Sequence, residues 1–213
     1  MSTISARQSP ALPLSSKVLL GMAFAVGISF VFAFVFPYFL SSAALNQYLG
    51  KKVWLLIHIS MGTIALMVGP FALGLGLSRR RMDLHRRIGL AYIIAIGFSS
   101  LAALYLAAHT DVNWVFGLGL SGLGVASLLT TGLALAAIKK RLIAQHQEWM
   151  IRSYVVTFGF VNFRILAGIL QAANVGTLVE RLAAASWFCW AFPLLVTEAC
   201  LQGRKIFRNS RPQ

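Results

Sequence analysis

Polar and ionisable side chains recur along one face of an otherwise apolar stretch in the second half of the chain. At about 100° per residue of an α-helix, five of them fall within about 40° of one another: His146, Ser153, Thr157, Arg164 and Gln171. An unpaired charge as deep in hydrocarbon as Arg164 costs several kcal/mol. We therefore expect Arg164 to pair with an anionic ligand group, with water or with carbonyls, and to mark a functional site.

Histidines are the second group of residues that could take part in chemistry, because imidazole nitrogens ligate metals and haem iron. His85 and His146 each stand where an apolar stretch leaves the same membrane face, so we expect them at one level. At that level His85 and His146 could be the metal ligands of one haem, or both could face lipid headgroups; the two interpretations stay open. His58 is expected at an outer level near Arg164, and we interpret His109 as a surface residue of a short outer loop.

A row of small residues follows His58 at helical spacing. Five residues fall within about 40° of His58 on a helical wheel: Gly62, Ala65, Gly69, Ala72 and Gly76. Two interpretations stay open. Small residues let neighbouring helices approach closely, or this face accepts a flat macrocycle with the His58 imidazole as axial ligand.

The elements that carry these residues are predicted to cross a membrane. Of the 213 residues, 58% are hydrophobic and only 11% are charged, a composition that soluble domains of this size do not have. Runs of about 18 or more apolar residues can cross a hydrocarbon core of about 30 Å. We predict an all-α, polytopic bundle of about six transmembrane helices, at residues 18–40, 53–77, 88–108, 112–138, 149–173 and 182–201.

The basic residues set the predicted orientation. Most of the 19 Lys and Arg residues fall in the tails and in alternate connections, whereas the other side has Lys51, Lys52 and Arg181. Connections enriched in this way are cytoplasmic, so both termini are predicted inside. The net charge of +14 therefore indicates contact with anionic lipid headgroups of the bilayer, and not nucleic-acid binding. Residues 1–16 are expected to be a disordered cytoplasmic tail, 17–201 the membrane domain, and 202–213 a basic cytoplasmic tail.

Sequence patterns for enzyme activity are weak. The run from Gly117 to Gly122 matches the dinucleotide fingerprint G-x-G-x-x-G, but it lies inside an apolar span and not between a strand and a helix. Close helix packing explains it better. No Ser-His-Asp set or His-x-x-x-His pair is present. Catalytic residues and enzymatic activity stay open.

Several short runs together resemble a known bacterial family. The runs begin at His58 (HISMG), Gly69 (GPF), His85 (HRRIGLAY) and His146 (HQEWMIRSY), with Arg164 beyond them. They resemble the predicted membrane proteins of the family called domain of unknown function 2306, over roughly residues 50–170. The resemblance implies a multi-span protein of the bacterial inner membrane but supplies no reaction. The family is also loosely similar to small membrane b-type cytochromes, in which histidines on neighbouring helices ligate haem.

These observations select candidate cofactor-binding residues: His58, His85, His146, Arg152, Tyr154 and Arg164. The first functional hypothesis is electron transfer within the membrane. Haem b would be held by imidazoles, with Arg152 or Arg164 and Tyr154 contacting its propionates, and with a quinone or redox protein as partner.

Two further hypotheses use the same residues without a cofactor. Arg164 could hold the anionic group of a transported or bound small molecule, with His58 as a protonatable neighbour. Alternatively, the arginine and histidines could serve as interhelical polar links in a structural subunit of a membrane complex. Oligomeric state and helix order around the bundle are not readable from the sequence.

Overall fold

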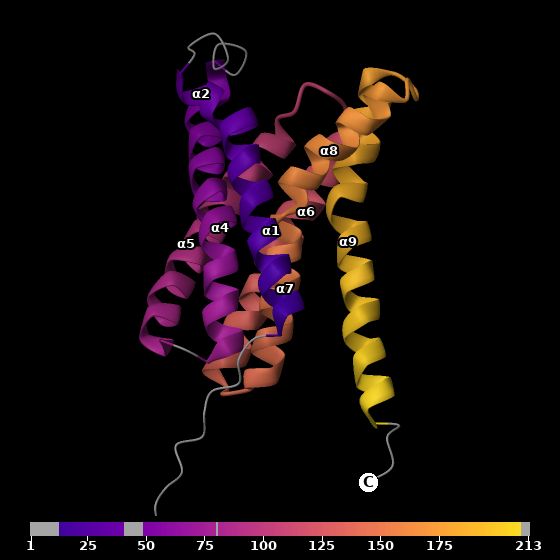
Figure 1. Ribbon diagram of the computed structural model, residues 1–213. Coiled ribbons are helices and arrows are strands. Elements are labelled where there is room, and N and C mark those ends of the chain that lie inside the picture. Colours follow the sequence, from indigo (N-terminus) through magenta and orange to yellow (C-terminus); the bar gives the residue numbers. More distant parts are fainter. Residues whose placement is uncertain (1–12, 41–48, 80, 210–213) are drawn as a thin grey trace, which may run out of the picture.

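The fold was analysed in a computed structural model that describes residues 13–40, 49–79 and 81–209 (Figure 1). Within these ranges the chain is helical apart from short connections. Its elements in chain order are α1 (Leu14–Phe30), the π-helix η1 (Val31–Val35), α2 (Phe36–Leu40), the 3-10 helix η2 (Leu49–Lys51), α4 (Lys52–Ser78), α5 (Met82–Ala108), α6 (Trp114–Lys139), α7 (Ile143–Thr157), α8 (Gly159–Ala172) and α9 (Leu178–Asn209). They make 6 helices long and apolar enough to cross a membrane in the described part of the chain. The predicted all-α, six-span architecture is confirmed.

Helix ends extend beyond the apolar runs. Helix α1 begins at Leu14, inside the segment 1–16 expected to be a tail, and residues 1–12 lie outside the described ranges. Helix α9 continues to Asn209, well into the segment 202–213. Polar residues continue a helix because each added turn satisfies backbone hydrogen bonds. Hydropathy therefore located the spans but underestimated the lengths of the first and the last.

The two ends of the bundle differ in charge. Helix α1 begins and α9 ends at the same end, where the turns between α4 and α5 and between α6 and α7 also lie (Figure 1). This end, which we call the basic end, carries Arg79 and Arg81 in the first turn and Lys139, Lys140 and Arg141 in the second. The charge asymmetry thus coincides with one face of the fold. That this face is cytoplasmic stays a prediction.

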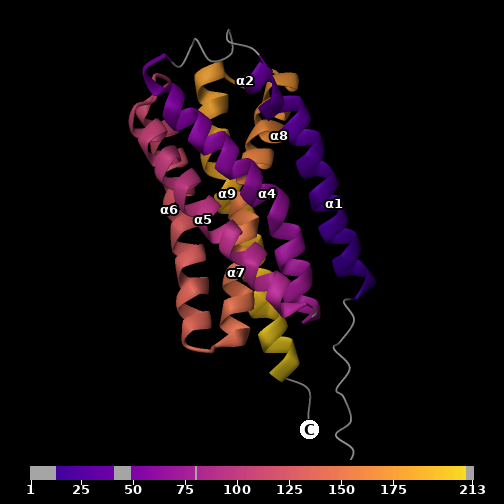
Figure 2. The ribbon, with the colours of Figure 1, turned by 90° about the vertical axis from the view of Figure 1, so that its left-hand side faces the viewer.

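The core lies where α4, α5, α6 and α7 meet. It contains Ala65, Tyr92, Ala95, Ile96, Ala134, Met150 and Tyr154. Helix α1 lies at the periphery and packs mainly on α4, as Figure 2 shows. The four central helices therefore position the residues that could do chemistry.

A proline in α4 creates a hydrogen-bond acceptor in this core. Pro70 has no N–H, so the carbonyl of Leu66, four residues earlier, has no helical donor. The Tyr154 hydroxyl of α7 donates to that carbonyl over 3.3 Å. Membrane helices tolerate proline where a neighbouring side chain satisfies the freed carbonyl in this way.

Helix α9 also contains a proline whose freed carbonyl accepts from a neighbouring helix. Pro193 frees the carbonyl of Cys189, and Asn162 Nδ2 of α8 donates to it over 3.1 Å.

Helices α6 and α9 approach each other closely at Gly119. A Cβ added at Gly119 of α6 would lie 2.2 Å from Ser186 Oγ of α9. This close approach of α6 to α9 is the packing role predicted for the glycine run.

The fifth span is interrupted at Phe158. Residues 143–157 and 159–172 form separate helices, α7 and α8, with a turn between them. The Val161 N–H bonds to the Phe158 carbonyl three residues earlier, at 3.0 Å. A turn of this kind locally tightens the helix and divides the span into two helical segments.

Candidate functional site

Two histidines meet at the basic end. His85 lies in the first turn of α5 and His146 in the first turn of α7. His85 Nδ1 is 2.9 Å from the Ala72 carbonyl oxygen of α4, and His146 Nδ1 is 2.9 Å from the Ala134 carbonyl oxygen of α6. A carbonyl only accepts, so each Nδ1 donates the proton. In the neutral imidazoles both Nε2 atoms then keep their lone pairs for a ligand.

The geometry of this histidine pair is specific. The two ring centroids are 6.5 Å apart, and the ring planes make an angle of 84°. Gly76 makes room for the arrangement, since a Cβ there would lie 2.7 Å from His85 Cε1. His85 and His146 lie at one level of the bundle, as the topology predicts. The structure adds that their half-buried rings are in contact.

The small-residue face of α4 is covered by protein side chains. Tyr154 lies over Gly69, where an added Cβ would be 2.3 Å from Cε2 of the ring, and Ser99 lies over Gly62. Close helix packing is therefore the role of this face. His58 at the head of this face donates from Nδ1 to the Ser99 carbonyl oxygen of α5 over 3.0 Å and packs edge-on against Phe160, with ring centroids 4.7 Å apart.

A buried hydroxyl cluster fixes α7 against its neighbours. The Tyr92 hydroxyl of α5 lies 2.9 Å from both Ser153 Oγ and Thr157 Oγ1. Ser153 Oγ also lies 2.7 Å from Thr131 Oγ1 of α6. Ser153 and Thr157 belong to the predicted polar line, but the sequence did not indicate that Tyr92 and Thr131 would be their partners.

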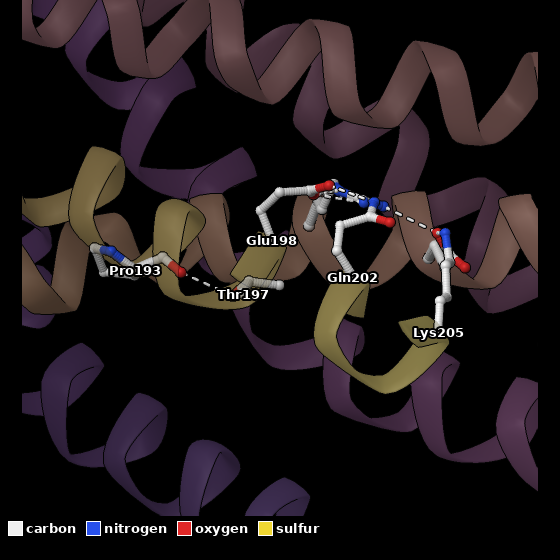
Figure 3. A network of polar contacts seen from close by, with 7 residues as sticks. Pro193, Thr197, Glu198, Gln202 and Lys205 are labelled. Atoms are coloured by element: carbon white, nitrogen blue, oxygen red, sulfur yellow. Dashed lines mark hydrogen bonds and ion pairs between the residues drawn. The ribbon is translucent and has the colours of Figure 1, made fainter. Parts of the chain in front are cut away.

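Arg152 is the centre of a charged network near the basic end. Its side chain is 7% exposed, and Nη2 and Nε lie 2.5 and 2.7 Å from Glu198 Oε2 of α9. Glu148 lies one turn earlier on α7 and binds Lys205 of α9 at 2.8 Å. Figure 3 shows Glu198, Gln202 and Lys205 on one face of α9, with Gln202 donating to Glu198. The contact of Arg152 with Glu198 joins α7 to α9.

Arg164 has a different environment from the one expected. It is exposed on α8, with its guanidinium carbon 5.6 Å from the Phe34 ring centroid and 5.9 Å from that of Phe163. No ion pair of Arg164 occurs within residues 13–40, 49–79 and 81–209. Within the predicted polar line, Ser153 and Thr157 of α7 are thus buried, whereas Arg164 and Gln171 of α8 are exposed.

The remaining histidine does not join a site. His109 ends α5, where Nδ1 lies 2.8 Å from the Tyr105 carbonyl of its own helix and the ring stacks on Tyr105 at 4.2 Å. This agrees with the surface role expected for it.

Tyr154, a predicted cofactor contact, is 6% exposed, and its hydroxyl donates to the Leu66 carbonyl. Of the six candidates, the structure brings only His85 and His146 into direct contact.

Comparisons with known proteins identify one family. A family model described as "Predicted membrane protein (DUF2306)" matches residues 55–201. No curated protein and no solved structure matches this chain. The matched segment contains both residues of the histidine pair, Arg152 and Glu198. Because the match covers more than half of the sequence, the chain belongs to the DUF2306 family of predicted membrane proteins.

Proposed function

We propose that the histidine pair binds haem b and that this integral membrane protein transfers electrons within the bacterial inner membrane. The observation that carries the proposal is the separation of 6.5 Å between the two imidazole centroids. Two imidazoles this close would both be within reach of a single haem iron through their Nε2 atoms. The angle of 84° between the ring planes is held by the hydrogen bonds of the two Nδ1 atoms, and two imidazoles that hold one haem need not be coplanar.

The donor set favours haem over a bare metal ion. Within the described residues no group of three or more His, Cys, Asp or Glu side chains is placed to hold a metal. A bare ion such as Zn²⁺ takes three or four protein ligands. Haem iron needs only two axial ligands from the protein, and when bound it would supply a one-electron carrier.

The surrounding residues have defined roles in this proposal. The Ala72 and Ala134 carbonyls accept from Nδ1 and fix the orientation of each imidazole, which also makes Nε2 a stronger ligand. Arg86 follows His85 and is exposed at the basic end, where it can pair with a propionate carboxylate. Arg152 and Tyr154 are less suited to that task, because each is bound to another partner.

The test is the absorption spectrum of the purified protein, expressed with ample haem and recorded oxidised and then reduced. We expect a Soret band and sharp reduced α and β bands, with about one haem per chain. Alanine at His85 or His146 should abolish six-coordinate binding. His109→Ala is the matched control, since this histidine is exposed and bonded within its own helix.

Two results would contradict the proposal. One is a flat visible spectrum of correctly inserted protein from haem-supplemented cells. The other is full haem content with an unchanged spectrum in both the His85→Ala and the His146→Ala proteins. Loss of haem in His109→Ala as well would show that the assay reports general misfolding and not ligation.

An alternative function is binding or transport of an anion at Arg164. Its support is that this exposed guanidinium has aromatic neighbours, Phe34 and Phe163, and no carboxylate partner among the described residues. The expected result is that Arg164→Ala abolishes ligand uptake while membrane insertion is unchanged. Loss of insertion would instead indicate a structural role.

A further inference from the structure

A second potential binding site lies away from the histidine pair, on the side of α7 that faces α6 and α9. A pocket of about 380 Å³ opens there. Its lining includes Thr130 of α6, Trp149 and Arg152 of α7, and Trp190, Ala191 and Glu198 of α9. Ligand sites of proteins begin at about 300 Å³. The volume therefore suits a single ring system, with the rest of a larger ligand outside.

Arg152, which lines the pocket, has one guanidinium nitrogen without a hydrogen-bond partner. Arg152 is 6% exposed, and its Nε and Nη2 bind Glu198. Nη1 is buried and has no hydrogen-bond partner among the described residues, since Glu148 Oε2 is 3.7 Å away. A buried donor without an acceptor costs about 1–3 kcal/mol. A ligand carbonyl oxygen that displaces neighbouring side chains enough to reach Nη1 would remove this cost.

The charges around the pocket are balanced. Arg152 and Lys205 are matched by Glu148 and Glu198 in one connected network. A fatty-acid carboxylate or an organic cation would gain no net electrostatic attraction there and would lose its hydration on entry. The balance therefore favours an uncharged ligand with a hydrogen-bond acceptor.

The walls of the pocket favour a flat and apolar ligand. Trp149 and Trp190 contribute two indole rings, and aromatic faces stack on planar rings. Both rings are held in place, Trp149 by the Arg152 guanidinium 4.6 Å from its centroid and Trp190 by a 3.1 Å bond to the Gly119 carbonyl. Leu195 at the rim is 67% exposed on the apolar surface of α9, so a ligand would enter from the lipid.

We infer that this pocket binds the head group of a membrane-dissolved quinone, whose apolar tail lies in the lipid. A quinone is uncharged and planar, and its carbonyl oxygens accept hydrogen bonds. The role of the quinone as an electron partner rests on the proposed haem function. Its binding does not, because the pocket uses none of the haem ligands.

The test uses the full-length purified protein and a radiolabelled benzoquinone with a decyl tail. Saturable binding of one molecule per chain is expected. Ala191→Phe and Leu194→Trp each place a larger side chain in the pocket without removing a polar group, and each should weaken binding at least tenfold. Ala184→Phe is the matched control, because Ala184 is exposed on the same helix and does not line the pocket; its affinity should be unchanged.

The outcomes separate this inference from the haem proposal. Absence of saturable binding, or unchanged affinity in both filled variants, would overturn it. Displacement of the quinone by oleate at equal concentration would overturn the choice of an uncharged ligand. His85→Ala should lose haem and keep quinone binding. Quinone binding by a wild-type protein without haem would refute the haem proposal alone.

Discussion

The two halves of the fifth span use their polar residues in opposite ways. In α7, the Arg152, Ser153 and Thr157 side chains are buried, and each has a partner on another helix. In α8, Arg164 and Gln171 are exposed, and Asn162 is the residue that bonds to another helix. A hydropathy profile describes both halves as one span, yet only α7 lies among four helices that supply partners, α4, α5, α6 and α9. Position within the bundle therefore decides which polar residues build a site.

The largest expected difference between the two halves is that between their arginines. Arg152→Leu removes the cation from Glu198 and Glu148 and should lower the free energy of unfolding by about 1.5–3 kcal/mol, the range for hydrogen bonds to charged groups. Arg164→Leu removes a cation without an ion pair in the described residues and should change it by less than about 0.5 kcal/mol. Denaturant unfolding of both proteins in detergent checks this. Equal destabilisation would remove the distinction between α7 and α8.

A pair of glycine substitutions tests packing against the same two helices. Gly69→Ala should cost about 1–3 kcal/mol, because the new Cβ would lie 2.3 Å from the Tyr154 ring. Gly168→Ala in α8 meets nothing within 4 Å and should stabilise the helix by up to about 1 kcal/mol. Thermal unfolding of the two variants gives the comparison. A neutral Gly69→Ala would mean that Tyr154 does not pack on α4.

Much of this arrangement follows from sequence patterns. Hydropathy predicts six spans, and the helical period places Ser153 and Thr157 on one face. Alternation of spans predicts the common level of His85 and His146. These features depend on local sequence and on the thickness of the membrane.

Other features depend on neighbours that a single sequence does not specify. Arg152 could be matched with Glu198 only once α7 and α9 are known to be adjacent. The turn at Phe158 is only weakly indicated in the sequence, by the glycine that follows it. In the structure, a Cβ added at this Gly159 would lie 3.1 Å from Leu123. Pro70 gave a usable signal that was missed, since a proline inside a span predicts a free carbonyl and a donor to satisfy it.

The smallest expected effects concern the two proline-freed carbonyls. Tyr154→Phe in α7 and Asn162→Leu in α8 each remove one donor, to Leu66 and Cys189 respectively. Interhelical hydrogen bonds in membrane proteins contribute about 0.6 kcal/mol on average. Both variants should therefore lose similar, small amounts of stability in the same unfolding assay. A much larger loss in Asn162→Leu would indicate that α8 is held as tightly as α7.

The most direct test of the haem proposal is the optical spectrum of His146→Gly before and after addition of free imidazole. Removal of one axial ligand should convert a low-spin spectrum to a high-spin one, and imidazole should restore the low-spin bands by occupying the vacated position. His109→Gly should keep the low-spin spectrum throughout. A low-spin spectrum of His146→Gly without imidazole, or no haem in the wild-type protein, would contradict the assignment of the histidine pair as ligands.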